Sequence, residues 1–195
     1  MIDINRFRNL IVRPSLKAVD LWSEDDEELL ILTCAQESLG CTYLRQIKGP
    51  ALGPYCCEPT TYESYWKDYL YKNSYYHVLE HGVALENTIL YKILKFINQE
   101  KVLSDGKYYN PFSLIEKPYY IPDINLLMEN FLYASIMCRV HYLRVSEPIP
   151  SRSNIQLLAE YYKKHYNTDK GKATVEEAIK NYYAFIGGSH ESNSQ

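Results

Sequence analysis

The sequence has no long hydrophobic run and no excess of positive charge. Its longest apolar region, residues 124–143, is interrupted by Glu129 and Arg139, and no segment approaches an uninterrupted membrane span. Lys and Arg total 21 against 24 Asp and Glu, which argues against a nucleic-acid partner held mainly by phosphate contacts. Residues 1–12 lack the apolar stretch of a signal peptide, so we expect the chain to fold in the cytoplasm where it is made.

Paired cysteine motifs are also absent. The chain has five cysteines and no C-x-x-C, and an odd number of this kind disfavours a disulfide framework. Adjacent Cys56 and Cys57 are the one hint of a metal site, with Cys41 or Cys34 as further ligands. Neighbouring cysteines seldom chelate one tetrahedral ion well, and no histidine is near in sequence. We therefore expect buried thiols, no metal and no cofactor.

What the sequence does have is a helical pattern along almost its whole length, with 20 tyrosines among its residues. Residues 29–35 are apolar on nearly all sides of a helix, which is typical of a buried helix, and residues 124–145 form a second one. Turn residues mark a loop at 39–58, with a short β-excursion considered at 41–47, and a second loop at 100–122. The predicted helices begin at Pro14, after the cap Ser23, at Pro59, after Ser74, after Asp123, and after a capping box of Thr174 and Glu177.

Two buried helices surrounded by amphipathic ones predict an all-α globule with one irregular loop. We expect one domain over residues 1–188 and a mobile tail over residues 189–195.

Glu37 is the candidate catalytic residue, because it follows residues 29–36, which carry no charge. If this helix end stays in the core, burial disfavours the charged carboxylate and raises its pKa. A glutamic acid with a raised pKa can protonate a glycosidic oxygen near neutral pH. The alternative is a solvated glutamate at a helix end, which is the commoner situation.

The residues after Glu37 favour a ligand-binding cleft. Ser38 and Gly40 let the helix end at a cleft wall, and Gly49 and Gly53 have no side chain to block a close approach of a ligand to the backbone. Tyr55 offers a ring face for a sugar or a hydroxyl for a hydrogen bond.

These residues resemble a motif of goose-type lysozymes and soluble lytic transglycosylases. In that family Glu-Ser ends a buried helix, and a loop of the pattern Gly-Ala-hydrophobic-Gly-Leu-hydrophobic-Gln precedes Pro-x-Thr. Glu37 and Ser38 match the first part, and the segment "ALGPYCCEPTT", residues 51–61, follows. The residues in register with the loop are Ala51, Leu52, Gly53, Tyr55, Pro59 and Thr61.

The resemblance implies a lysozyme-like fold in which Glu37 is the catalytic acid. The residues that it places against substrate are Ser38, Ala51, Leu52, Gly53, Tyr55, Cys56, Glu58 and Tyr142.

The chain departs from the family pattern at several positions. Cys56 stands where the enzymes have Gln, and a thiol is a weaker hydrogen-bonding group than an amide. Pro54 stands where they have Leu, and their later Tyr-Asn-Gly segment has no clear counterpart. Tyr142 is the nearest candidate for the tyrosine that faces the acid. Glu58 is a second carboxylate, either a base toward water or a solvated side chain.

The chain also resembles a set of small tailed-bacteriophage proteins built on this lysozyme-like core. That likeness covers most of the length, including residues 133–145 and 158–183. It implies a virion-associated protein that degrades peptidoglycan locally during infection. It would be made in the host cytoplasm and carried in the particle in several copies among other virion proteins. The alternatives are a structural component of the tail or neck with weakened or lost activity, and a module that only binds glycan.

Overall fold

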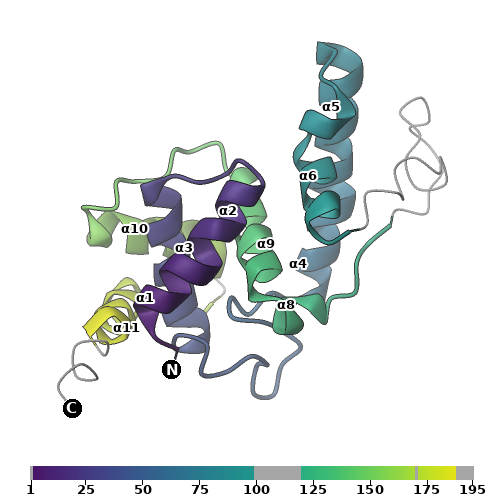
Figure 1. Cartoon of the computed structure of the whole chain (residues 1–195). Helices are drawn as coiled ribbons and strands as arrows, with labels where there is room; N and C mark the ends of the chain where they lie inside the picture. Colours follow the sequence, from purple (N-terminus) through teal and green to yellow (C-terminus); the bar gives the residue numbers. More distant parts are fainter. Residues whose placement is uncertain (1, 99–119, 170, 188–195) are drawn as a thin grey trace. The chain divides into compact units, whose positions relative to one another are not determined.

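The computed structural model describes residues 2–98, 120–169 and 171–187 and shows a mostly helical chain (Figure 1). Within these residues there is no strand, only the isolated β-bridges Arg45–Leu52 and Leu52–Cys57, so the all-α prediction is confirmed. The predicted β-excursion at 41–47 is limited to the first of these bridges. The elements are α1 Ile4–Arg6, η1 Phe7–Val12, α2 Arg13–Ala18, α3 Glu24–Ser38, α4 Pro59–Ser64, η2 Tyr65–Leu70, α5 Tyr71–His81, η3 Leu85–Asn87, α6 Ile89–Phe96, α8 Leu126–Glu129, α9 Phe131–Leu143, α10 Ile155–Tyr162, η4 Lys163–Asn167 and α11 Val175–Gly187. The segments η1, η2 and η4 are π-helical, and η3 is a 3₁₀ turn.

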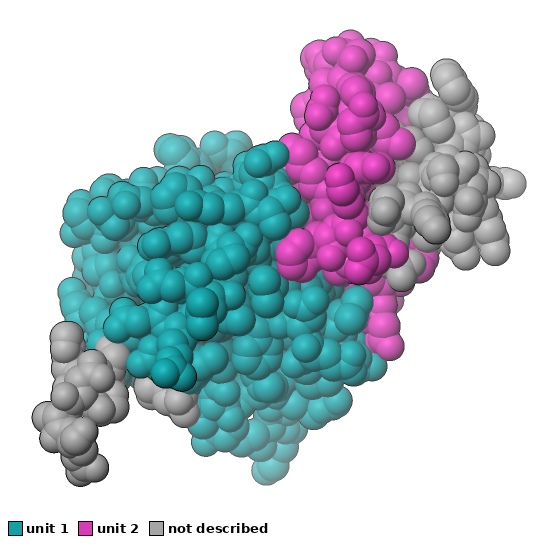
Figure 2. All heavy atoms as spheres, viewed as in Figure 1, with its two compact units in different colours: residues 1–58, 125–195 teal, residues 59–124 magenta. Residues whose placement is uncertain are grey.

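The contacts divide the chain into two compact units (Figure 2). Unit 1 comprises residues 1–58 and 125–195, and unit 2 comprises residues 59–124. The single domain expected over 1–188 therefore stays a prediction. The tail expected at 189–195 lies outside the described residues, as does the loop expected at 100–122 except for its last three positions.

Helix α3 is the buried element of unit 1. Its N-cap is Ser23, whose hydroxyl accepts a hydrogen bond from the Asp26 backbone N–H at 3.1 Å, as predicted. The side chains from Leu29 to Cys34 are fully buried, because α3 packs against η1, α9, α10 and α11. Both helices predicted to be buried, α3 and α9, bury most of their residues in the core of this unit, and those predictions are confirmed.

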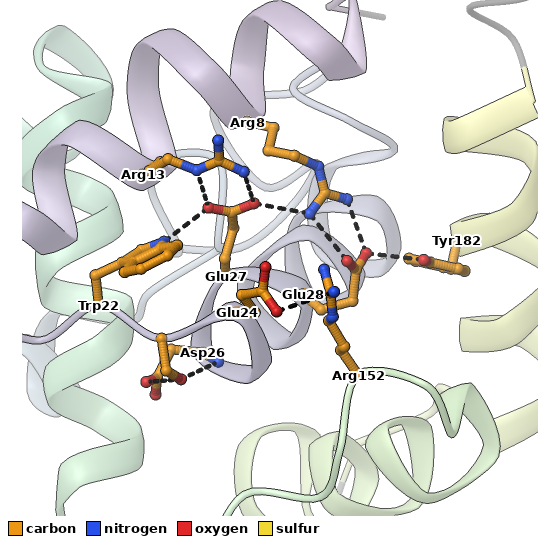
Figure 3. A network of polar contacts seen from close by, with 10 residues as sticks. Arg8, Arg13, Trp22, Glu24, Asp26, Glu27, Glu28, Arg152 and Tyr182 are labelled. Carbon is orange, nitrogen blue, oxygen red and sulfur yellow. Dashed lines mark hydrogen bonds and ion pairs between the residues drawn. The ribbon is translucent and has the colours of Figure 1, made fainter.

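The acidic first turn of α3 is held by arginines from the N-terminal helix (Figure 3). Arg13 binds Glu27 through two hydrogen bonds of 2.7 and 2.9 Å. Arg8 reaches both Glu27, at 3.0 Å, and Glu28, at 2.9 Å. Burial acts to raise the pKa of Glu27, but the hydrogen bonds from Arg13, Trp22 and Arg8 outweigh it and lower that pKa.

Glu28 also accepts a hydrogen bond of 2.8 Å from the Tyr182 hydroxyl of α11. The network therefore joins the N-terminal helix, α3 and α11. A local sequence pattern does not reveal this pairing, because the arginines lie 14 to 20 residues away from their glutamates.

Three predicted helix starts need correction. The first helix begins at Ile4 rather than Pro14, and Asp3 caps it by accepting from the Arg6 N–H at 2.8 Å. Ser74 lies inside α5 and is buried, because the helical run from Pro59 to His81 has no break. Asn130, not Asp123, caps α9. The capping box of Thr174 and Glu177 is confirmed, with reciprocal hydrogen bonds of 2.9 and 3.1 Å.

Unit 2 consists of the helical run α4–η2–α5 followed by η3 and α6. Two buried tyrosines of the run bind backbone carbonyl groups at the end of the unit. The Tyr62 hydroxyl donates to Pro122 O at 3.0 Å, and the Tyr71 hydroxyl donates to Tyr120 O at 2.9 Å. These bonds anchor residues 120–122 to the helical run.

Glu27→Gln should lower the free energy of unfolding by about 3 kcal/mol, because it leaves Arg8 and Arg13 without their shared buried carboxylate. The matched control is Glu24→Gln on the same turn, which removes an exposed ion pair with Arg152 at 2.9 Å and should cost under about 1 kcal/mol. Urea denaturation followed by circular dichroism measures both. Equal losses in the two variants would show that the network contributes no more than a surface pair.

Candidate functional site

The end of α3 places Glu37 one residue before the helix terminates at Ser38. The next residue, Leu39, has a left-handed conformation with φ of 49°, and Gly40 and Cys41 follow with φ of 61° and 62°. Three consecutive residues of this kind turn the chain back on itself. The Ser38 hydroxyl secures the turn by donating to Cys34 O at 3.1 Å and accepting from the Cys41 N–H at 2.9 Å.

Glu37 is half-buried and is surrounded by neutral groups of unit 1. Its Oε1 accepts a hydrogen bond from the Tyr162 hydroxyl at 2.5 Å, and the Asn167 side chain also bonds to its carboxyl group. The Cys56 thiol donates to the backbone carbonyl of Glu37 at 3.1 Å. Within the described residues, the hydrogen-bond partners of the carboxyl group are therefore a hydroxyl and an amide, and neither is a cation.

The environment raises the pKa of Glu37 to about 7. Burial is the main cause, and the hydrogen bonds from Tyr162 and Asn167 offset part of it by favouring the charged form. Around neutral pH the carboxyl group is therefore present in both protonation states. A group of this kind can donate a proton in one step of a reaction and accept one in the next.

Tyr162 and Asn167 come from the junction of α10 with the π-helical turn η4. Along this segment the rings of Tyr162 and Tyr166 stack with centroids 6.0 Å apart. The Tyr166 hydroxyl donates to Tyr55 O at 2.6 Å, which ties η4 to the loop that follows α3. Single π-helical turns of this kind are frequent at functional sites.

The loop at 39–58 is folded onto its own unit at most of the predicted ligand-contact positions. Tyr55 is buried, and its hydroxyl pairs with Ser135 of α9 at 2.8 Å. Leu52 and Cys57 exchange backbone hydrogen bonds of 3.0 and 2.9 Å. Gly53 has φ of 79°, and a Cβ there would lie 2.5 Å from Leu127 O. The glycine therefore allows close packing against α8, and the approach of a ligand to this backbone stays a prediction.

The structure divides the predicted site residues into two groups. Glu37 and Cys56 are half-buried and adjacent, and Glu58 is exposed. The others are buried and pack within unit 1: Ser38, Ala51, Leu52, Gly53, Tyr55 and Tyr142. The side chains of this second group make internal contacts. Glu37 and Cys56 are therefore the two predicted residues that are adjacent and partly exposed.

The tyrosine that contacts the acid is Tyr162, not Tyr142. Tyr142 is 1% exposed, and its hydroxyl pairs with Thr33 inside the core at 2.8 Å. The sequence does not single out Tyr162, because it belongs to one of several Tyr doublets and lies on an amphipathic helix. The available signal was the four-residue spacing of Tyr162 and Tyr166, which places both rings on one helical face; Asn167 gave no such signal.

Cys56 occupies the position that the resemblance assigns to glutamine. Its backbone is left-handed, with φ of 45°. Burial, and then the charge of Glu37, raise the pKa of its thiol to about 12, so the thiol keeps its proton and donates it. All five cysteines lie within the described residues, and none forms a disulfide. Over the same residues, no three His, Cys, Asp or Glu side chains are grouped as metal ligands.

No helix in the described part of the chain has the length and apolarity to cross a bilayer. Comparison of the chain with protein-family models, curated proteins and solved structures finds no match.

Glu37→Gln should change how stability depends on pH. The folded-state pKa of about 7 exceeds the ordinary value of 4.5, so the folded protein retains a proton that the unfolded chain releases between these pH values. The native chain therefore loses stability as pH rises through this interval. Relative to it, the variant should gain up to about 3 kcal/mol in free energy of unfolding between pH 4.5 and 8. Urea midpoints across pH measure the gain, and Glu58→Gln, at an exposed position, is the control; a flat difference for Glu37→Gln would contradict the raised pKa.

Tyr162→Phe should raise the pKa of Glu37 further, because the lost hydroxyl donates to the charged carboxylate. We expect the protonation constant of Glu37 to increase about tenfold, the usual effect of one hydrogen bond to a charged group. Titration of the Glu37 carboxyl carbon by NMR measures it. Tyr161→Phe is the matched control, because that hydroxyl donates to Glu147 O instead; the same increase there would remove the specific role of Tyr162.

Proposed function

We propose that the chain is a phage virion-associated protein that cleaves peptidoglycan, with Glu37 as its general acid and base. The observation that carries the proposal is the Glu37 carboxyl group, half-buried and held by neutral donors with a pKa of about 7. A glycosidic oxygen needs a proton as its bond to the sugar breaks, and this carboxyl group holds one near neutral pH.

The proposed reaction uses one acidic residue. Glu37 protonates the glycosidic oxygen between the muramic and glucosamine sugars, and the bond from that oxygen to the sugar breaks. The oxygen of the attacking group, which is either water or the sugar's own hydroxymethyl group, then bonds to the anomeric carbon while the Glu37 carboxylate takes its proton. The second route yields the anhydro sugar of a lytic transglycosylase.

Tyr162 and Asn167 have defined tasks in this proposal. Their hydrogen bonds favour the charged carboxylate, so they stabilise Glu37 after it has given up its proton. Burial acts in the opposite direction and favours recapture of a proton. The balance keeps both states accessible during the catalytic cycle, which a strongly acidic or fully buried carboxyl group would not allow.

A second candidate function is a lysozyme-like structural component of the virion without activity. The observation that favours it is the burial of loop residues that match the lysozyme motif. The side chains of Ala51, Leu52 and Tyr55 are between 2% and 5% exposed. Residues that serve only packing would persist in a framework whose chemistry has been lost. Either candidate predicts that the chain is a stoichiometric part of purified particles, which mass spectrometry of virions tests.

Purified protein should clear peptidoglycan in a gel assay, and Glu37→Gln should reduce clearing at least a hundredfold because it removes the proton donor. Activity should fall as pH rises above about 7, where Glu37 loses the proton that it must donate. Glu58→Gln is the control, because it alters an exposed carboxyl group in the same loop. Equal clearing by Glu37→Gln would exclude Glu37 as the acid, and no clearing by any form leaves the structural candidate in place.

A further inference from the structure

We propose that Lys163 is a positioning residue for Glu37 and acts through the side-chain amide of Asn167. Its catalytic meaning rests on the proposed function, whereas the contacts themselves do not. Lys163 begins the π-helical turn η4 and Asn167 ends it, so both belong to the segment that follows Tyr162. Sequence analysis gave neither residue a role.

The Lys163 ammonium group is bound on one side by three oxygen acceptors. Its Nζ donates to Asn167 Oδ1 at 2.8 Å, to Thr168 O at 2.8 Å and to Gly171 O at 3.0 Å. An ammonium group has three N–H donors, so this set uses all of them. The lysine is therefore held in one place, and it fixes the oxygen end of the Asn167 amide.

Fixing the amide oxygen also fixes the amide nitrogen. Asn167 bonds to the carboxyl group of Glu37 and to the hydroxyl group of Tyr162. Because Oδ1 accepts from Lys163, the two N–H groups of Nδ2 are the donors that remain for these two partners. Without Lys163 the amide is free to turn over and present its oxygen to the carboxylate, which would repel the charged form.

The turn after η4 is shaped to leave room for this amide. A Cβ added at Gly171 would lie 2.2 Å from Asn167 Oδ1. A side chain at this position would therefore displace the amide. Gly171 supports the same arrangement as the lysine, because its carbonyl oxygen also accepts from Lys163 Nζ.

Lys163 reaches Glu37 indirectly. Within the described residues, the causes that set the pKa of Glu37 are burial and the hydrogen bonds from Tyr162 and Asn167, and Lys163 is not among them. The contribution of Lys163 therefore passes through the orientation of the Asn167 amide.

The test is the protonation constant of Glu37, measured by NMR titration of its carboxyl carbon in the full chain without substrate. Lys163→Met should increase this constant about tenfold, as should Asn167→Ala, because each removes the oriented donor to the charged carboxylate. The double variant should equal Asn167→Ala alone, since the lysine has nothing left to orient. Lys164→Met is the matched control, because Lys164 instead pairs with the exposed Glu147 at 2.6 Å.

Gly171→Ala provides a second route, because it displaces the amide while leaving Lys163 intact, and it should raise the constant in the same direction. An unchanged constant in both Lys163→Met and Gly171→Ala would overturn the proposal. So would full additivity of the two changes in the double variant, which would indicate a direct effect of the lysine charge. Because the titration uses no glycan, its outcome is separate from that of the gel-clearing assay.

Discussion

The burial of α3 on all sides is the constraint on which the rest of unit 1 depends. From Leu29 to Cys34 the helix offers no polar face to solvent, so the charged residues at its ends are drawn out of water with it. The two ends meet this cost differently. At the N-terminus the carboxylates are neutralised by arginines, whereas at the C-terminus the partners of Glu37 in the described part of the chain are hydroxyl and amide donors.

That difference gives two glutamates of one helix opposite properties. Cationic partners overcome burial at Glu27 and lower its pKa, which makes it a permanent charge that holds elements together. Neutral partners only moderate burial at Glu37, so its pKa rises to about 7. A carboxyl group left in this state costs stability, and a helix end that tolerates the cost is where chemistry is expected. The same comparison explains why the proposal for an enzyme rests on Glu37 rather than on the larger acidic cluster.

The sequence was informative where a local pattern fixes a local structure. The caps at Ser23 and Thr174 and the burial of residues 29–35 followed from short-range hydrogen bonding and helical periodicity, and all are present. The failures have a common cause. Pro14 and Ser74 look like helix starts in isolation, but helices run through both, because tertiary packing of their apolar faces outweighs a single local signal.

For the candidate site, the sequence by itself determined that Glu37 follows an uncharged run on a buried helix, a position that favours desolvation of its carboxyl group. It could not supply the partners of that carboxyl group. Tyr162 and Asn167 lie at least 125 residues away, and they meet Glu37 because α10 packs against α3 and η4 packs against α9. Only the tertiary structure decided that Tyr142 pairs with Thr33 and that Ala51, Leu52 and Tyr55 are buried. Both outcomes depend on which neighbours fill the space around each side chain.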